Sequence, residues 1–112
     1  MYNNYEEIYK DIPTYNRFLK VDEIDELVKS IKKIPNVNSK IIGKTINNEN
    51  LEMLEIGNGK KTALITGVPH SDEPLGSLVV TFFARWLATH SEKEFFGWFL
   101  CNRVNCRFIC CV

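Results

Sequence analysis

The fold is decided by the stretch Ala63-Leu64-Ile65-Thr66-Gly67-Val68-Pro69-His70-Ser71-Asp72-Glu73-Pro74-Leu75-Gly76. The short apolar run at its start predicts a strand covered on both faces, as in an α/β layer. Gly67 and Pro69 then predict a turn. Pro74 suits the first position of a helix, which makes Glu73 the predicted N-cap. The stretch therefore predicts a strand, a polar corner and a helix in succession.

The corner itself carries the chemistry. His70 and Glu73 stand three residues apart, between the predicted strand and the predicted helix. A corner of this kind can hold an imidazole and a carboxylate as two metal ligands on a rigid edge. Asp72 is a candidate third carboxylate, but in a tight turn it is expected to cap the helix or face water.

The elements around the corner follow from periodicity and breakers. A helix from Pro74 to about Thr89 is predicted with a broad apolar stripe, namely Leu75, Leu78, Val79, Phe82, Phe83, Trp86 and Leu87. An earlier helix is indicated by apolar residues at helical spacing, namely Ile24, Leu27, Val28 and Ile31, with Asp22 as its cap or first-turn acid.

Strands are predicted at residues 39–46, 51–56 and 62–66, and a last one is expected to start near Phe95. The polar residues 47–50 between the first two predict a hairpin loop, because Asn tolerates left-handed conformations. The order predicts an α/β fold with a mixed sheet, in which the first strands pair as antiparallel hairpins and the Pro74 helix is a crossover.

Composition excludes several classes of function. Of 112 residues, 45% are hydrophobic and 25% charged, and the formal net charge is zero. Nucleic-acid and acidic-membrane partners therefore have no electrostatic support. The N-terminus shows no secretory signal, and no run approaches the length of a membrane span. A cytoplasmic protein is the expectation.

The end of the sequence is unusual for a domain. All four cysteines fall in the last twelve residues, a pattern of neither a disulfide framework nor a zinc ribbon. The run 97–112 has strand-like composition without a turn signal or a polar finish. We expect the natural domain to continue further, with residues 96–112 as an atypical ending such as a shifted reading frame.

The residues quoted above resemble the HxxE zinc-binding motif of the zinc carboxypeptidases, the carboxypeptidase A-like superfamily. That superfamily includes the succinylglutamate desuccinylase and aspartoacylase branch. Three further stretches resemble its first helix, its hairpin strand and the two strands before the motif: Val21-Asp-Glu-Ile-Asp-Glu-Leu-Val, Ile42-Gly-Lys-Thr and Leu54-Glu-Ile-Gly-Asn-Gly-Lys-Lys-Thr-Ala-Leu-Ile. The resemblance covers roughly Val21 to Phe99, the N-terminal part of a mixed-sheet α/β/α domain.

The resemblance implies zinc as the cofactor, with His70 and Glu73 as its first two ligands. Catalytic zinc of this class takes two histidines and one glutamate, and carboxypeptidase A is a standard example of it. The family's second histidine, its substrate-binding arginine and its glutamate base come later than any residue matched here. They are therefore expected beyond the chain end. His90 lies about 25 Å from Glu73 along the helix and is excluded as the third ligand.

The resulting expectation is a metallocarboxypeptidase-type hydrolase, in which zinc-activated water cleaves a peptide bond. Residues 1–20 are predicted as an N-terminal extension and residues 21–112 as a truncated, inactive domain. Two alternatives stay open: an amidohydrolase of the desuccinylase/aspartoacylase branch acting on N-acyl amino acids, and a non-catalytic remnant. Ser71 favours the peptidase, because the other branch often has Gly after the motif His. The sequence makes no prediction of the oligomeric state.

Overall fold

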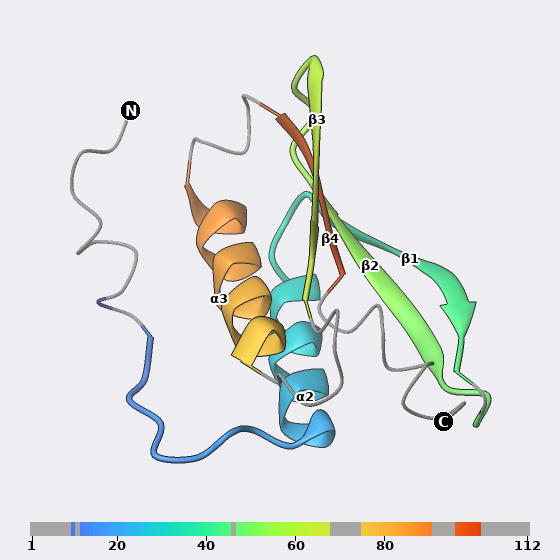
Figure 1. Cartoon of the computed structure of the whole chain (residues 1–112). Coiled ribbons are helices and arrows are strands. Elements are labelled where there is room, and N and C mark those ends of the chain that lie inside the picture. The colour runs from blue at the N-terminus through green and yellow to red at the C-terminus, as the bar shows by residue number, and fades with distance from the viewer. Residues whose placement is uncertain (1–9, 11, 46, 68–74, 91–95, 102–112) are drawn as a thin grey trace.

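Two helices lie side by side on one face of a mixed sheet (Figure 1). The computed structural model describes residues 10, 12–45, 47–67, 75–90 and 96–101. Within these residues the elements follow the order α2 (Val21–Lys32), β1 (Val37–Lys44), β2 (Asn50–Ile56), β3 (Lys61–Thr66), α3 (Leu75–Thr89) and β4 (Phe96–Cys101). The predicted α/β class with a mixed sheet is confirmed.

Helix α2 forms where the apolar spacing predicts it. Its buried residues are Ile24, Val28 and Ile31, one face of a 3.6-residue period. Acidic residues occupy its first turn and lysines its last, an arrangement that suits the helix dipole. The Glu23 carboxylate accepts a hydrogen bond from the Lys20 backbone N–H at 3.1 Å, which satisfies an otherwise unpaired donor at the helix start.

The predicted hairpin joins β1 to β2. The two strands pair antiparallel from Val37 opposite Ile56 to Lys44 opposite Asn50, with a bulge between Ile41 and Gly43. In the connecting loop Asn48 has a φ of 64°, the left-handed conformation expected of an Asn there.

Strand β4 is central, which the sequence did not indicate. The described strands follow the order β1-β2-β4-β3. The prediction of consecutive hairpins is confirmed for β1–β2 and is wrong for β2–β3, because β4 pairs antiparallel with β2 and parallel with β3. The physical reason is apolarity: β4 has no charged residue, and Leu100 and Cys101 are buried between the neighbouring strands. Helix α3 is the predicted crossover.

Strand β3 is therefore at an edge of the described sheet. The prediction that Ala63-Leu64-Ile65 is covered on both faces is also wrong, since Leu64 is 66% exposed. Ala63 and Ile65 lie on the opposite face from Leu64, and Ile65 packs against the core under the helices. One face of β3 is covered and the other is open.

Helix α3 buries only part of the predicted stripe: Phe82 and Leu87 are buried, and Leu78, Phe83 and Trp86 are partly buried against the core. Leu75 and Val79 are more than half exposed. The buried residues are Ser77, Val80, Thr81, Phe82, Ala84, Leu87 and Ala88. Small side chains on this face let the helix backbone lie close to α2 and the sheet. The aromatic residues Phe82, Phe83 and Trp86 serve as packing, because all three are buried or pack against the core. No helix among the described residues is both long and apolar enough to cross a bilayer.

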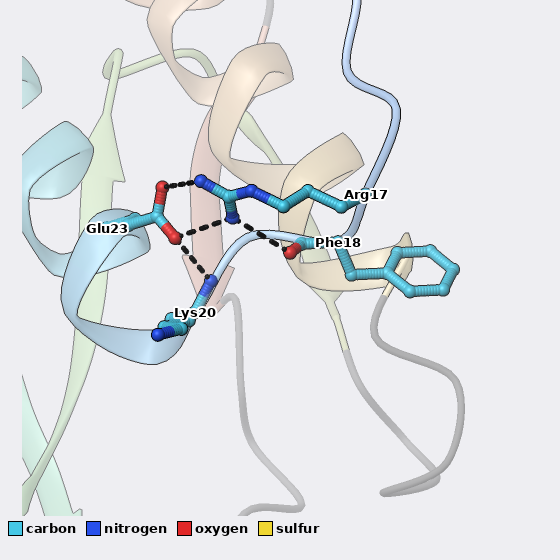
Figure 2. Close-up of polar contacts among 4 residues, drawn as sticks. All are labelled: Arg17, Phe18, Lys20 and Glu23. Carbon is cyan, nitrogen blue, oxygen red and sulfur yellow. Dashed lines mark hydrogen bonds and ion pairs between the residues drawn. The ribbon is translucent and has the colours of Figure 1, made fainter.

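Several residues before α2 contact the helices, and Figure 2 shows the polar contacts of Arg17 with Glu23 of α2. The Arg17 guanidinium donates to both oxygens of the Glu23 carboxylate, at 2.8 and 2.9 Å. Hydrogen bonding from Arg17 is the main cause that lowers the pKa of Glu23 to about 2. The Tyr15 ring lies 6.2 Å from the Phe82 ring, and Leu19 packs against the core. The predicted boundary of the extension at residue 20 stays a prediction.

Candidate metal site

The two candidate ligands lie in a gap between described elements. His70 and Glu73 fall in residues 68–74, outside the described residues, together with Asp72. Their predicted roles as zinc ligands therefore stay predictions. The structure does describe the elements that flank the corner on both sides, β3 up to Gly67 and α3 from Leu75.

The sheet side of the corner is held by β4. Thr66 is paired with Cys101 in the parallel register, and Gly67 is buried. The Gly67 N–H donates to the Cys101 carbonyl oxygen at 2.7 Å, which extends the pairing by one residue beyond β3. The corner thus begins at the carboxyl ends of two parallel strands, where ligands bind in open α/β sheets.

The helix side of the corner is held by the buried face of α3. Ser77, Val80 and Thr81 are buried within the first two turns. The Thr81 hydroxyl donates to the Ser77 carbonyl oxygen at 2.7 Å, so its polar atom has an acceptor in the core. The N-terminal end of a helix carries partial positive charge, which favours a carboxylate immediately before it. Glu73 has this position in the sequence.

His90 has a structural role at the other end of α3. Its Nδ1 lies 2.7 Å from the Trp86 carbonyl oxygen, which can only accept, so Nδ1 carries the hydrogen and donates it. The imidazole also stacks on the Trp86 ring at 4.5 Å between centroids. Helix α3 runs unbroken from Leu75 to Thr89, about 21 Å at 1.5 Å per residue. This length of helix agrees with the expectation that His90 is not the third zinc ligand.

Cys101 is the one cysteine among the described residues, and it is a buried thiol that forms no disulfide with them. Cys101 is the last residue of β4 and lies opposite Thr66, at the carboxyl ends of the two strands where the corner begins. The sequence could not show this without the strand order. The other three cysteines lie outside the described residues. Within the described ranges no three His, Cys, Asp or Glu side chains gather where they could hold a metal ion.

A small cavity lies between the two helices and the sheet. It has a volume of about 30 Å³, and its lining includes Asp25 of α2, Glu52 of β2 and Thr81 of α3. That volume suits a water molecule and is too small for a peptide. The Lys32 ammonium binds Glu52 at 2.8 Å, which ties the end of α2 to the sheet.

The donor chemistry of the corner fits zinc in part. Neutral imidazole nitrogen and carboxylate oxygen are both normal zinc ligands, and a catalytic site needs three protein ligands. The sequence has two histidines, and one of them is His90 at the far end of α3. The sequence therefore places two of the three predicted ligand types at the corner, and their roles stay predictions.

Comparisons with known proteins agree with this geometry. A family model described as zinc carboxypeptidase matches residues 24–100. No curated protein matches the chain by sequence. Among 17 matching solved chains is bovine thrombin-activatable fibrinolysis inhibitor in complex with tick carboxypeptidase inhibitor, with a TM-score of 0.66 and 15% identity. That match covers 80% of this chain and 31% of the bovine chain, and it shows a shared fold. Because the family model spans more than half of the 112 residues, the chain belongs to the zinc carboxypeptidase family.

Proposed function

We propose that this chain contributes two ligands of a catalytic zinc site in a carboxypeptidase-type hydrolase, and that these ligands are His70 and Glu73. The observation that carries the proposal is the family match over residues 24–100, which spans the whole corner between β3 and α3. The flanking geometry supports it, because both elements are anchored within the core on either side of the two residues.

Each residue has a distinct task in this proposal. His70 binds the metal through a neutral imidazole nitrogen, and Glu73 binds it through a carboxylate oxygen. When bound, zinc would polarise a scissile carbonyl group and make water a stronger nucleophile at neutral pH. Both residues belong to the short stretch of sequence between the anchored ends of β3 and α3, and catalytic groups need to be held close to one geometry.

The complete reaction needs more than this chain offers. The matching part of this chain covers 31% of the bovine thrombin-activatable fibrinolysis inhibitor chain. The sequence holds no histidine besides His70 and His90, and the latter is bound to Trp86 far from the corner. We therefore propose that the 112 residues alone bind zinc weakly and do not turn over a substrate.

Zinc titration by calorimetry tests the two ligands. The expected result is one zinc per chain, with binding lost in both His70→Ala and Glu73→Gln. The matched control is His90→Ala, which removes the same side chain at the opposite end of α3 and should leave the zinc affinity unchanged. Equal binding by wild type and His70→Ala, or no binding by wild type, would contradict the ligand assignment.

An activity assay tests the substrate class. Zinc-loaded chain is incubated with a blocked dipeptide, as a carboxypeptidase substrate, and with an N-acyl amino acid, as a substrate of the amidohydrolase branch. We expect no turnover of either. If the chain hydrolyses the dipeptide and His70→Ala abolishes this activity, the peptidase site is complete. If the chain hydrolyses only the N-acyl amino acid, the amidohydrolase proposal replaces the peptidase proposal.

A further inference from the structure

We propose that residues 15–20 form a strap across the two helices, which opens and closes as one unit because it is held at two points. One point is the Arg17–Glu23 pair on α2, and the other is the contact of Tyr15 with Phe82 on α3. In Figure 1 the chain reaches α2 from the side of α3. The strap precedes the range 24–100 that matches the family model, so the proposal goes beyond the metal chemistry proposed above.

The contact with α2 centres on the Glu23 carboxylate (Figure 2). Its Oε1 accepts hydrogen bonds from Arg17 Nη1 at 2.8 Å and from the Lys20 backbone N–H at 3.1 Å, and its Oε2 accepts one from Arg17 Nη2 at 2.9 Å. Arg17 Nη1 also donates to the Phe18 carbonyl oxygen at 3.2 Å. One guanidinium therefore joins the start of α2 to the backbone of the strap, in the paired geometry that fixes orientation best.

The contact with α3 is aromatic. The Tyr15 ring lies 6.2 Å from the Phe82 ring, at an angle of 41° between the ring planes. The Arg85 guanidinium carbon lies 4.6 Å from the centre of the same Phe82 ring, which is 4% exposed. Leu19, between Tyr15 and α2 in the chain, packs against the core. The strap thus contacts a buried ring of α3 at one end and a charged side chain of α2 at the other.

The two contacts are coupled because the chain between them is short. One residue separates Tyr15 from Arg17, so loss of either contact frees backbone dihedral angles that the other contact also needs fixed. An exposed ion pair and a single aromatic contact are each modest on their own. Together they offset the conformational entropy lost by the strap. The strap is therefore a local unit that opens while the helices and the sheet stay folded.

Limited proteolysis of the full chain tests this coupling from the α3 side. Tyr15→Ala leaves Arg17 and Glu23 in place, yet it is expected to speed tryptic cleavage after Arg17 by roughly two- to tenfold, the effect of losing one aromatic contact. The cleavage rate follows the population of the open form when opening is fast. Tyr15→Phe keeps the ring and should cleave at the wild-type rate. Cleavage after Arg85, inside α3, should stay unchanged and serves as the reference for unfolding of the helix.

The converse experiment starts from the α2 side. Glu23→Gln leaves the aromatic contact in place, and it is expected to speed chymotryptic cleavage after Tyr15 several-fold. Glu26→Gln is the matched control, because Glu26 is also an acid of α2 but pairs with Lys29 of the same helix. This control should cleave after Tyr15 at the wild-type rate. Mass spectrometry of the fragments identifies each cleaved bond.

Three results would overturn the strap. If Tyr15→Ala leaves cleavage after Arg17 unchanged, or Glu23→Gln leaves cleavage after Tyr15 unchanged, the two contacts are independent of each other. If either variant speeds cleavage after Arg85 as much as cleavage within the strap, the whole domain unfolds and no separate unit exists. If Tyr15→Phe behaves as Tyr15→Ala does, the ring contact does not hold the strap. All of these measurements are made without zinc, so their outcome is separate from that of the ligand assignment.

Discussion

Single residues secure the segment before α2 to the two helices. Arg17 and Glu23 form a two-bond ion pair, although their side chains are 58% and 36% exposed. Exposed ion pairs contribute little to stability as a rule, but paired bonds between a guanidinium and a carboxylate are the stronger kind. Because the same Glu23 carboxylate also caps α2 through Lys20, loss of its charge affects the segment and the helix together.

The pH dependence of stability tests this ion pair. The pKa of Glu23 is lowered from 4.5 to about 2, chiefly by its hydrogen bond from Arg17. Its contribution to stability is therefore present above pH 4.5 and is lost as the pH falls toward 2. Glu23→Gln should lower the melting temperature at pH 6 by a few degrees at most, and the difference from wild type should vanish near pH 2.

The control for this prediction is Glu26→Gln. Glu26 accepts a single hydrogen bond from Lys29 at 3.0 Å and is 73% exposed, so its loss should change the melting temperature less. A gap between wild type and Glu23→Gln that stays the same down to pH 2 would contradict the role of the carboxylate charge.

A backbone position gives a second prediction at the residue scale. Gly57 follows β2 with a φ of 79°, a conformation that costs a side-chain-bearing residue about 1–2 kcal/mol. Gly57→Ala should lower the free energy of unfolding by that amount in urea denaturation. Gly43→Ala is the control, because its new Cβ would meet only Leu51 Cδ1 at 3.7 Å, an ordinary contact. Equal effects of the two substitutions would contradict the conformational explanation.

At the scale of elements, α3 shows why an apolar stripe does not identify the buried face. The helix is apolar nearly all round, so several faces could have been buried. Packing against α2 and the sheet selects the face with small residues, and this leaves Leu75 and Val79 outside. The corner with His70 and Glu73 precedes this helix in the chain, so the choice of face also orients the start of α3.

Two substitutions on α3 test the buried face. Leu87 is fully buried in the core, so Leu87→Ala should lower the free energy of unfolding by about 2–5 kcal/mol. Val79→Ala removes apolar atoms from a side chain that is 57% exposed, and it should cost less than about 0.5 kcal/mol. Chemical denaturation measures both. A larger loss for Val79→Ala than for Leu87→Ala would mean that the helix packs by its other face.

At the scale of the whole molecule, β4 joins two parts of the chain that do not pair with each other. The β1–β2 hairpin lies on one side of it and β3 on the other, so all four strands form one sheet only through β4. Leu100 contributes to the same core as Ile31 of α2 and Leu87 of α3. The sheet, both helices and the flanks of the candidate metal corner therefore depend on residues near the end of the sequence.

Truncation tests this dependence. A chain that ends at residue 95 lacks β4, and it should show no cooperative thermal melt by circular dichroism. A chain that ends at residue 101 keeps β4 and separates the loss of this strand from the loss of residues 102–112. Cooperative melting of the shorter chain would contradict the central position of β4.

The sequence by itself determined the elements and the family. Apolar periodicity predicted α2 and α3, Asn residues predicted the hairpin loop, and the combination of hairpin, strand and HxxE corner indicated the zinc carboxypeptidases. These signals are local, since each depends on residues within a few turns or along one strand. The ligand roles of His70 and Glu73 stay predictions that zinc titration can test.

Only the tertiary structure decided the order of the described strands, the buried face of α3 and the position of β3 at an edge of the described sheet. These features depend on competition among elements that are far apart in the sequence. The strand Phe96–Cys101 takes the centre because burial there removes its apolar side chains from water on both sides. Leu64 and Leu100 are both leucines in predicted strands, yet one is 66% exposed and the other 2%, because only the second lies between two strands and beneath the helices.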